Sequence, residues 1–189
     1  ISMLLGPLVL VLIDKLLMPH YARHNKPTLA EIDEPQDAPV IIAGFGRYGQ
    51  IIGRMLSAQG MAATVLDHDA EMVEAARTFG YQVFYGDATR LDLLRTAGAG
   101  SAKVLVVAVD DVTQSLALVD LAREHFPHLQ IVARARDVTH WNELRDRGVA
   151  HIERELFESS LRSARNVLEL MGQAPHEARQ HAMRFRRHN

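Results

Sequence analysis

Short apolar runs alternate with longer amphipathic stretches over residues 40–150, and this alternation is the strongest pattern in the sequence. Continuous apolar runs of this length are typical of strands that are buried on both faces of a sheet. We expect strands at 40–43, 62–66, 82–85, 104–109 and 129–133, with a short sixth strand at 151–153. Helical stretches lie between these runs, so the pattern predicts a doubly wound α/β fold, in which a parallel sheet carries helices on both faces.

Glycine and aspartate mark the expected ends of the helices. Left-handed backbone at a helix C-terminus favours glycine, and four glycines stand where it is needed: Gly60, Gly80, Gly98 and Gly148. Aspartate is a preferred N-cap, and we expect this role for Asp69, Asp137 and either Asp110 or Asp111. These signals support the same order of strands and helices.

The last part of the chain has a different pattern. Apolar residues recur there at spacings of three and four, at Phe157, Leu161, Ala164, Leu168 and Met171. This spacing predicts one apolar face on a helix, which ends at Gly172 before Pro175 opens a second helix. The apolar face is expected to pack either on a partner subunit or on the chain's own sheet, and the pattern does not decide between them.

The first 18 residues form an apolar segment, uncharged from Met3 to Ile13. A helix of that length spans about 16 Å, roughly half of a membrane's hydrocarbon core. The chain begins with Ile, and basic residues follow the segment at Lys15, Arg23 and Lys26. Both features favour the end of a last transmembrane helix followed by the cytoplasmic side. A buried helix of a soluble protein is the alternative.

Residues 19–39 are expected to form a linker. Four prolines and four acidic residues lie within them, and proline interrupts helices and central strands. His20 and His24 stand four residues apart, which allows a metal site in principle, but solvated linker histidines are the simpler interpretation.

Composition excludes several classes of protein. Hydrophobic residues make up 48% of the 189 residues and charged residues 23%, which is inconsistent with a disordered chain. The absence of cysteine excludes disulfides, zinc–thiolate sites and thiol catalysis. A formal net charge of −2 argues against a sequence-independent nucleic-acid binder, since such proteins are basic.

A Gly44-Phe45-Gly46-Arg47-Tyr48-Gly49 motif follows the first expected strand and opens a helix. In this context the three glycines allow a tight turn, close approach of a phosphate, and close helix–strand packing, while free N–H groups face the anion. Asp67 ends the second strand, 18 residues after Gly49, where an acid accepts a bond from a ribose 2′-hydroxyl. The pattern predicts a Rossmann-like nucleotide site and disfavours a ligand with a 2′-phosphate.

Two further groups of polar residues end strands at the same edge of the expected sheet. Asp87 and Thr89 follow the third strand, and Asp87 either caps the next helix or reaches the ribose or adenine of the ligand. Asp110 and Asp111 follow the fourth strand, where helix capping is the favoured role and a cation site a minor option.

No catalytic residues are predicted. A dehydrogenase needs a second domain to hold its substrate, and 189 residues leave no room for one. No Ser/His/Asp or Lys/Tyr set follows the sheet, and the ten histidines are interpreted mostly as surface residues. The site is expected to be a sensor, with an NAD-dependent oxidoreductase as a less favoured alternative.

Several segments together resemble the Kef glutathione-gated potassium efflux systems of the cation:proton antiporter-2 group. These segments are IIAGFGRYGQ, LDHD, FYGDATR and FPHLQIVARARD, followed by Glu153-Arg154-Glu155 and FRRHN. The resemblance implies four parts: the end of the last transmembrane helix at 1–18, a linker at 19–39, a nucleotide-binding RCK/KTN domain at 40–153, and helices for dimerisation and ligand contact at 154–189.

The resemblance also implies ligands and their contacts. AMP or NAD(H) would bind at Gly44, Gly46, Arg47, Gly49, Asp67, Asp87 and Thr89. Glutathione would bind between subunits at Arg54, Arg154 and Asn189, with Phe79 as the aromatic residue that responds to the bulk of an adduct. Glutathione would hold the antiporter shut and bulky adducts would open it. A gating domain that responds to nucleotide alone is the alternative.

The same resemblance implies a homodimer attached to its own transmembrane antiporter domain, with this part on the cytoplasmic side of a bacterial inner membrane. A soluble quinone-reductase-like subunit is a further implied partner, and nucleic acid is not. No metal site is implied.

Overall fold

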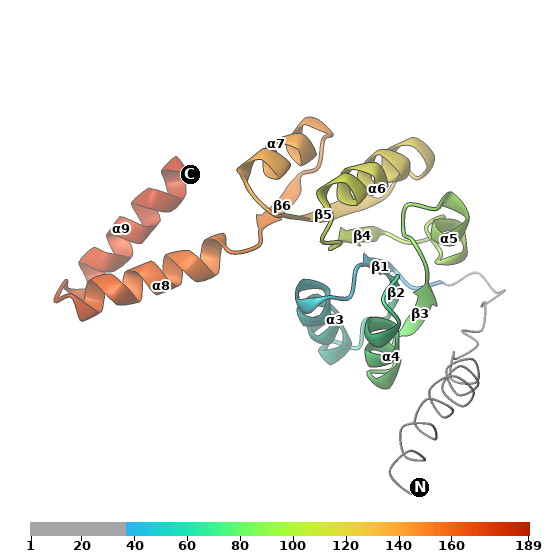
Figure 1. Ribbon diagram of the computed structural model, residues 1–189, viewed down its shortest axis with the longest axis horizontal. Coiled ribbons are helices and arrows are strands. Elements are labelled where there is room, and N and C mark those ends of the chain that lie inside the picture. Colours follow the sequence, from blue (N-terminus) through green and yellow to red (C-terminus); the bar gives the residue numbers. More distant parts are fainter. Residues whose placement is uncertain (1–36) are drawn as a thin grey trace, which may run out of the picture. The chain divides into compact units, whose positions relative to one another are not determined.

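The computed structural model describes residues 37–189 and contains one six-stranded parallel sheet, shown in Figure 1. Its strands are β1 (Val40–Ala43), β2 (Ala63–Asp67), β3 (Gln82–Tyr85), β4 (Val104–Val107), β5 (Gln130–Ala135) and β6 (His151–Arg154). The order across the sheet is β3-β2-β1-β4-β5-β6, and every neighbouring pair is parallel. The predicted doubly wound fold is confirmed, with its change of direction between β1 and β4.

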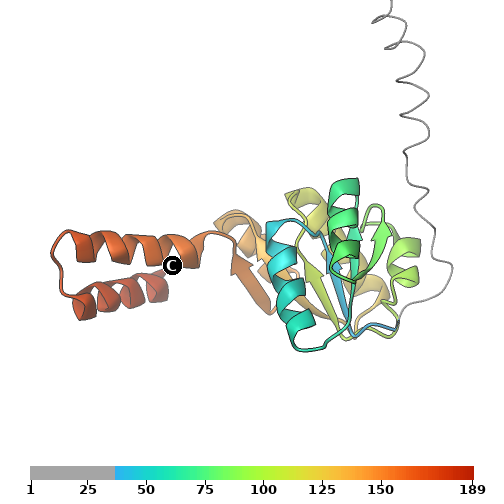
Figure 2. The same ribbon diagram turned by 90° about the horizontal axis from the view of Figure 1, so that it is seen from below.

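Helices cover both faces of the sheet, as Figures 1 and 2 show. On one face lie α3 (Arg47–Ala58) and α4 (Ala70–Thr78), which contact β1, β2 and β3. The other face carries α5 (Leu91–Thr96), α6 (Val112–His125) and α7 (Val138–Asp146). This arrangement leaves the carboxyl ends of β1 and β4 side by side, with a helix leaving each in opposite directions, and so opens a crevice there.

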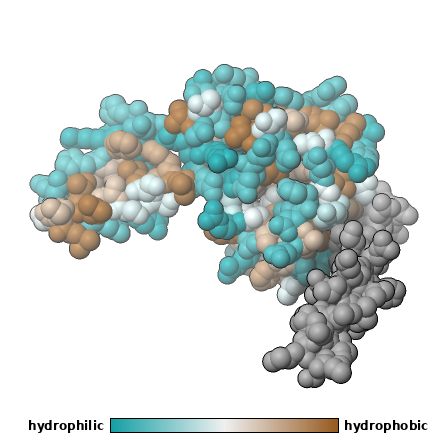
Figure 3. Space-filling model, in the orientation of Figure 1, coloured by the Kyte–Doolittle hydropathy of each residue, from teal (hydrophilic) through white to brown (hydrophobic). Residues whose placement is uncertain are grey.

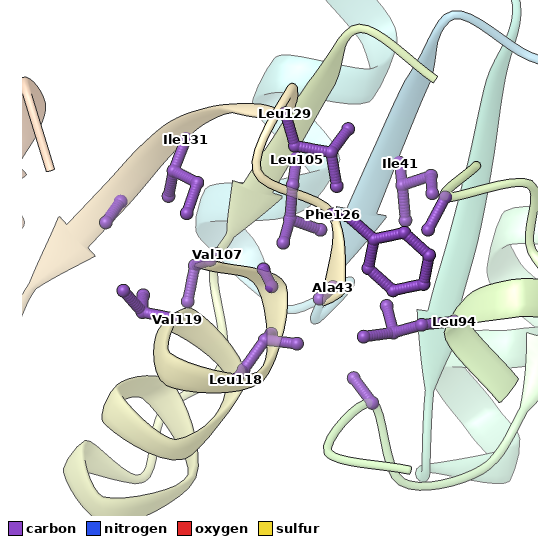
Figure 4. Packing of buried hydrophobic residues seen from close by; sticks show 14 of the residues in the cluster. Ile41, Ala43, Leu94, Leu105, Val107, Leu118, Val119, Phe126, Leu129 and Ile131 are labelled. Atoms are coloured by element: carbon purple, nitrogen blue, oxygen red, sulfur yellow. The ribbon is translucent and has the colours of Figure 1, made fainter. Parts of the chain in front are cut away.

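The main core lies between the sheet and the α5–α6–α7 face (Figure 4). Ile41, Leu105 and Ile131 point from three neighbouring strands towards Leu94 of α5 and Leu118 of α6. All four residues of β1 are buried, which explains why its sequence is continuously apolar rather than alternating. Each fully buried Leu or Ile contributes about 1.5–3 kcal/mol, so these residues fix the strand register.

The expected helix signals agree with the structure at most positions. All four predicted glycines have positive φ, and the side chains of Asp69, Asp111 and Asp137 cap α4, α6 and α7. Of the two alternatives after β4, Asp111 is therefore the cap, because Asp110 pairs with Arg134 instead. The strand β5 runs two residues further than expected, since Arg134 and Ala135 pair with β6.

The last two helices, α8 (Phe157–Leu170) and α9 (Pro175–His188), lie side by side and contact each other. The predicted apolar face of α8 meets α9, and the rings of Phe157 and Phe185 stack with centroids 6.3 Å apart. The alternative that this face packs on the chain's own sheet is therefore wrong. No residue of α8 is buried, and Met171 caps the helix with 80% of its surface exposed.

Residues 1–36 lie outside the described part, and with them the expected membrane-helix end, most of the linker, His20 and His24. Among residues 37–189, no helix is both long enough and apolar enough to cross a bilayer.

Candidate functional site

The glycine motif connects β1 to α3 in the geometry that its sequence predicts. Gly44 has a φ of +94°, and a Cβ there would come within 2.8 Å of the backbone of Ala108 and Val109. Its N–H donates to the carbonyl oxygen of Leu66 at 2.8 Å, which fixes the turn against β2. Only glycine avoids both the backbone strain and the clash with the end of β4.

The other two glycines of the motif have different surroundings. A Cβ on Gly49 would lie 2.1 Å from the carbonyl oxygen of Gly44, so glycine is needed for α3 to pack against the loop. A Cβ on Gly46 would meet nothing within 4 Å, because this residue borders an open cavity. Gly46 is also the N-cap of α3 and has no side chain to satisfy the helix's first N–H groups. Those donors remain available to an anion.

Asp67 lies at the end of β2 and is 92% buried. Its Oδ2 accepts a bond from the N–H of Phe45 at 2.6 Å, and its Oδ1 accepts one from the N–H of Asp69 at 2.8 Å. Each carboxylate oxygen can accept a second hydrogen bond. Asp67 therefore holds the glycine loop in place and still has acceptors for a ribose hydroxyl.

Asp87 and Thr89 form a tight turn after β3. The N–H and the hydroxyl of Thr89 both donate to Asp87 Oδ1, at 2.9 and 2.8 Å, and these bonds hold the pKa of the carboxyl below its ordinary value. Asp87 does not cap α5, whose N-cap is Arg90. Of the two sequence alternatives, capping is therefore wrong, and the ionised carboxylate borders the same cavity as Gly46.

These residues border one cavity of about 300 Å³ at the carboxyl edge of the sheet. It is bordered by the loops that follow β1, β2, β3 and β4, through Gly44, Gly46, Asp67, Asp87, Thr89 and Asp110, among others. Five of the seven predicted nucleotide contacts are thus brought together. Gly49 packs against the backbone of Gly44 and is not among the residues that border the cavity. The Arg47 side chain is 96% exposed and forms an ion pair with Glu155, which follows β6.

Sequence reasoning missed Arg134, a buried arginine beside this cavity. Its Nη2 donates to the carbonyl oxygen of Val109 at 2.9 Å and to Asp110, and its Nη1 lies 3.6 Å from Glu155. Only 5% of its surface is exposed. The signal was present: Arg134 interrupts the apolar pattern of β5, in the ARARD segment, directly at the carboxyl end of a buried strand.

Glu155 connects this arginine to the glycine loop. Arg47, the first residue of α3, lies 3.9 Å from Glu155, and the Arg134 guanidinium lies 5.9 Å from the centre of the Tyr48 ring. Burial raises the pKa of Tyr48, and the nearby carboxylate of Glu153 adds to this effect while Arg134 opposes it. The start of α3 and the ends of β4, β5 and β6 are thus joined by charged groups.

The predicted glutathione contacts are not all brought together within residues 37–189. Arg154 lies over the ring of Phe157 at 3.8 Å and donates to the backbone oxygen of Asn189 at 3.1 Å. Arg54 is exposed on α3, and Phe79 is 52% exposed at the end of α4. Phe79 borders a hollow beside the amino ends of β2 and β3, away from the glycine loop. Within one described chain, no contact joins Phe79 or Arg54 to Arg154.

One histidine differs from the expected surface position. His140 is 98% buried on α7, where its Nδ1 accepts a bond from the N–H of Arg136 and its Nε2 lies 3.2 Å from the Ser115 hydroxyl. Burial lowers the pKa of His140, which the carboxylates of Asp137 and Glu143 offset only in part. The lowered pKa favours the neutral form of His140, and both of its ring nitrogens have partners within the protein. Within residues 37–189, no three metal-ligating side chains gather at one place.

Comparison with protein families gives two matches. Residues 40–155 match the TrkA-N domain, and residues 159–189 match the potassium efflux system KefB C-terminal domain. The whole chain is 51% identical to the glutathione-regulated potassium-efflux system protein KefC of Escherichia fergusonii and 50% identical to that of Escherichia coli O139:H28. The chain spans 30% of the length of these relatives. The resemblance stated from the motifs is confirmed.

Solved structures agree with this assignment. The Kef C-terminal domain of Shewanella denitrificans in its AMP-bound form is 42% identical, with a TM-score of 0.73 over 79% of this chain and 90% of that one. A GsuK channel bound to NAD shares the fold alone, at 17% identity and a TM-score of 0.60 over 83% of this chain and 28% of that one.

Proposed function

Because the chain belongs to the TrkA-N domain family through residues 40–155, we propose that it is the ligand-sensing regulatory domain of a Kef-type potassium efflux system. It binds a nucleotide, AMP or NAD(H), at the carboxyl edge of its sheet. It also binds glutathione, which holds the efflux system shut, or a bulky glutathione adduct, which opens it. The observation that carries the proposal is that the glycine loop, Asp67 and Asp87 border one cavity.

The chemistry of this cavity supports a nucleotide. Free N–H groups at the start of α3 suit a phosphate, and Asp67 and Asp87 suit the hydroxyls of a ribose. A carboxylate at the end of β2 would repel a 2′-phosphate, which favours a ligand with a free 2′-hydroxyl. The AMP in the Kef domain of Shewanella denitrificans has the required groups.

The proposed glutathione site draws on Arg54, Phe79, Arg154 and Asn189. Glutathione has two carboxylates, which suit arginine, and each charge-assisted bond contributes about 1.5–3 kcal/mol. Arg154 and Asn189 are in contact while Arg54 and Phe79 lie elsewhere on the chain, which supports a site that two copies of the chain share. A homodimer is therefore part of the proposal.

We place this domain on the cytoplasmic side of a bacterial inner membrane, attached to its own transmembrane antiporter domain. The curated relatives are more than three times as long as the chain, which leaves room for that domain. A soluble quinone-reductase-like subunit is a further proposed partner. The domain is not an enzyme in this proposal, and its relatives are named as potassium efflux proteins.

Calorimetric titration of the purified chain with AMP, NADH, glutathione and a bulky glutathione adduct tests the proposal. We expect a nucleotide to bind with one site per chain, and glutathione and its adduct to compete with each other but not with the nucleotide. Binding of nucleotide without glutathione or adduct would instead support a domain gated by nucleotide alone. Hydride transfer to any substrate would support an oxidoreductase, and no binding of any ligand would contradict the proposal.

A further inference from the structure

The α8–α9 helix pair has a polar groove as well as its apolar hollow. The hollow is bordered by Phe157 and Phe185, whose rings stack. The groove has a volume of about 300 Å³ and lies between the same two helices. Its border includes four arginines, two from each helix: Arg162 and Arg165 from α8, and Arg179 and Arg186 from α9. None of the proposed nucleotide or glutathione contacts borders this groove.

Helical spacing brings these arginines together. Arg162 and Arg165 stand three residues apart, and Arg179 and Arg186 stand seven apart, so each pair lies on one face of its helix. Because the two faces border the same groove, four positive charges gather in a small space. Like charges at such short range repel one another, unless anions lie between them.

Acidic side chains offset this charge only in part. Arg186 pairs with Glu158 across the two helices, and the Nε of Arg165 lies 3.4 Å from a carboxylate oxygen of Glu169. Within the described residues 37–189, the side chains of Arg162 and Arg179 have neither an ion pair nor a hydrogen bond. The groove therefore has one guanidinium from each helix that is available to a ligand.

The composition of this part of the chain favours an anion as that ligand. Residues 157–189 contain six arginines against three glutamates, with no lysine and no aspartate, although the whole chain has a formal net charge of −2. The planar fork of arginine donates two parallel hydrogen bonds to a phosphate group. A phosphate has enough oxygens to accept such bonds from two arginines at once, whereas the two oxygens of a carboxylate suit one arginine.

From this groove we propose that the α8–α9 pair contains a second anion site, which binds a phosphate group, either free or in the headgroup of an anionic lipid. Arg162 and Arg179 donate to the phosphate oxygens from opposite helices. Arg165 and Arg186 add positive charge at the border of the site, where their acidic partners hold them in place.

Calorimetric titration of the full chain with inorganic phosphate tests the proposal, with AMP and glutathione present in excess to occupy their own proposed sites. We expect wild type to bind one phosphate per chain. Arg162→Gln combined with Arg179→Gln should weaken phosphate binding at least tenfold, because it removes both available guanidinium groups. Arg184→Gln combined with Arg187→Gln is the matched control: it removes the same charge from α9 at residues that do not border the groove, and phosphate affinity should stay within twofold of wild type.

Co-flotation with lipid vesicles distinguishes the two sources of phosphate. Vesicles of phosphatidylglycerol present an anionic phosphate, whereas vesicles of phosphatidylcholine are neutral overall. Binding to phosphatidylglycerol alone, lost in the groove variant and kept in the control, supports the proposal with a lipid headgroup as the ligand. Binding of free phosphate without binding to vesicles supports it with a soluble phosphate compound.

Two results would overturn the proposal. One is a wild-type chain that binds neither inorganic phosphate nor phosphatidylglycerol, and the other is an equal loss of binding in the groove variant and the control. Neither result affects the proposed function, since the groove lies apart from the cavity at the carboxyl edge of the sheet. AMP affinity should accordingly be the same in wild type and in both double variants.

Discussion

The glycines of the loop differ in how much space an added Cβ would have. Gly46 and Gly49 stand three residues apart in one motif, yet Gly46 faces the open cavity whereas Gly49 faces the carbonyl oxygen of Gly44. The sequence motif assigns both to nucleotide binding, whereas the structure separates a packing role from a ligand role. Substitutions at the two positions should therefore have different effects.

Gly49→Ala should destabilise the fold, because its Cβ would lie 2.1 Å from backbone that cannot move without distorting the loop. Overpacking of this kind costs about 1–3 kcal/mol. Gly46→Ala should leave the free energy of unfolding within about 0.5 kcal/mol of wild type, since the added methyl group meets no protein atom within 4 Å, but it should weaken AMP binding at least fivefold. Urea unfolding and calorimetry measure the two effects, and equal destabilisation by both changes would contradict the assignment.

Asp67 is a second residue with a testable role. Asp67→Ala should weaken nucleotide binding at least tenfold, since it removes the ribose acceptor together with the bond that holds the N–H of Phe45. Asp67→Asn keeps an acceptor oxygen and is expected to lose less affinity. Calorimetry with AMP decides the matter: unchanged affinity in Asp67→Ala would exclude Asp67 from the ribose site.

The buried His140 predicts how stability depends on pH. Because its pKa is lowered in the folded chain, the unfolded chain binds a proton first as the pH falls. Its contribution to stability is therefore complete above an unfolded pKa of about 6.5 and is lost progressively as the pH falls below that value. Between pH 7.5 and pH 5.5, the free energy of unfolding should fall more for wild type than for His140→Gln. The same fall in both proteins would show that another group is responsible.

At the scale of secondary-structure elements, the sheet was predictable and the last helices were only partly so. Four-residue buried strands such as Val40–Ala43 have a local signature, because burial on both faces excludes polar residues. The apolar face of α8 was also visible, but its partner was not, since any apolar surface satisfies such a face. In the structure the partner is α9, whose Phe185 ring stacks on Phe157 of α8.

The candidate site shows a similar division. Gly44, Gly46 and Asp67 could be predicted because their roles follow from local backbone geometry at a strand end. Arg134 could not be assigned from the sequence, because its role depends on Asp110, 24 residues earlier, and on Glu155, 21 residues later. The role of a buried charge can be assigned only when its partners in space are known.

Exposed apolar residues on the α8–α9 pair connect this scale to the whole molecule, and Figure 3 shows apolar colour on its surface. The most exposed of them are Leu170 at 87% and Met171 at 80%, with Val167, Met183 and Phe185 each more than half exposed. An apolar surface of this kind is typical of an interface. The proposed homodimer would cover it.

We therefore expect the chain to sediment as a dimer at micromolar concentration with ligand present. Leu170→Glu places a charge in the exposed apolar surface and should shift the chain towards monomer by at least tenfold in the dimer dissociation constant. Val138→Glu changes a residue that is equally apolar and 54% exposed, but on α7, and it serves as the control. Analytical ultracentrifugation distinguishes the species. Monomeric wild type, or a shift in the control alone, would contradict the proposed interface.

The most direct test of ligand sensing measures potassium efflux from cells that carry the full transporter with this chain as its regulatory domain. An electrophile that forms bulky glutathione adducts should accelerate efflux in wild type. Phe79→Leu should stay closed without electrophile but respond weakly, because a smaller side chain is less displaced by the adduct. Arg154→Ala should lose the difference between the two conditions, since it removes the anchor that both ligands share. Efflux that responds equally in wild type and both variants would contradict the account.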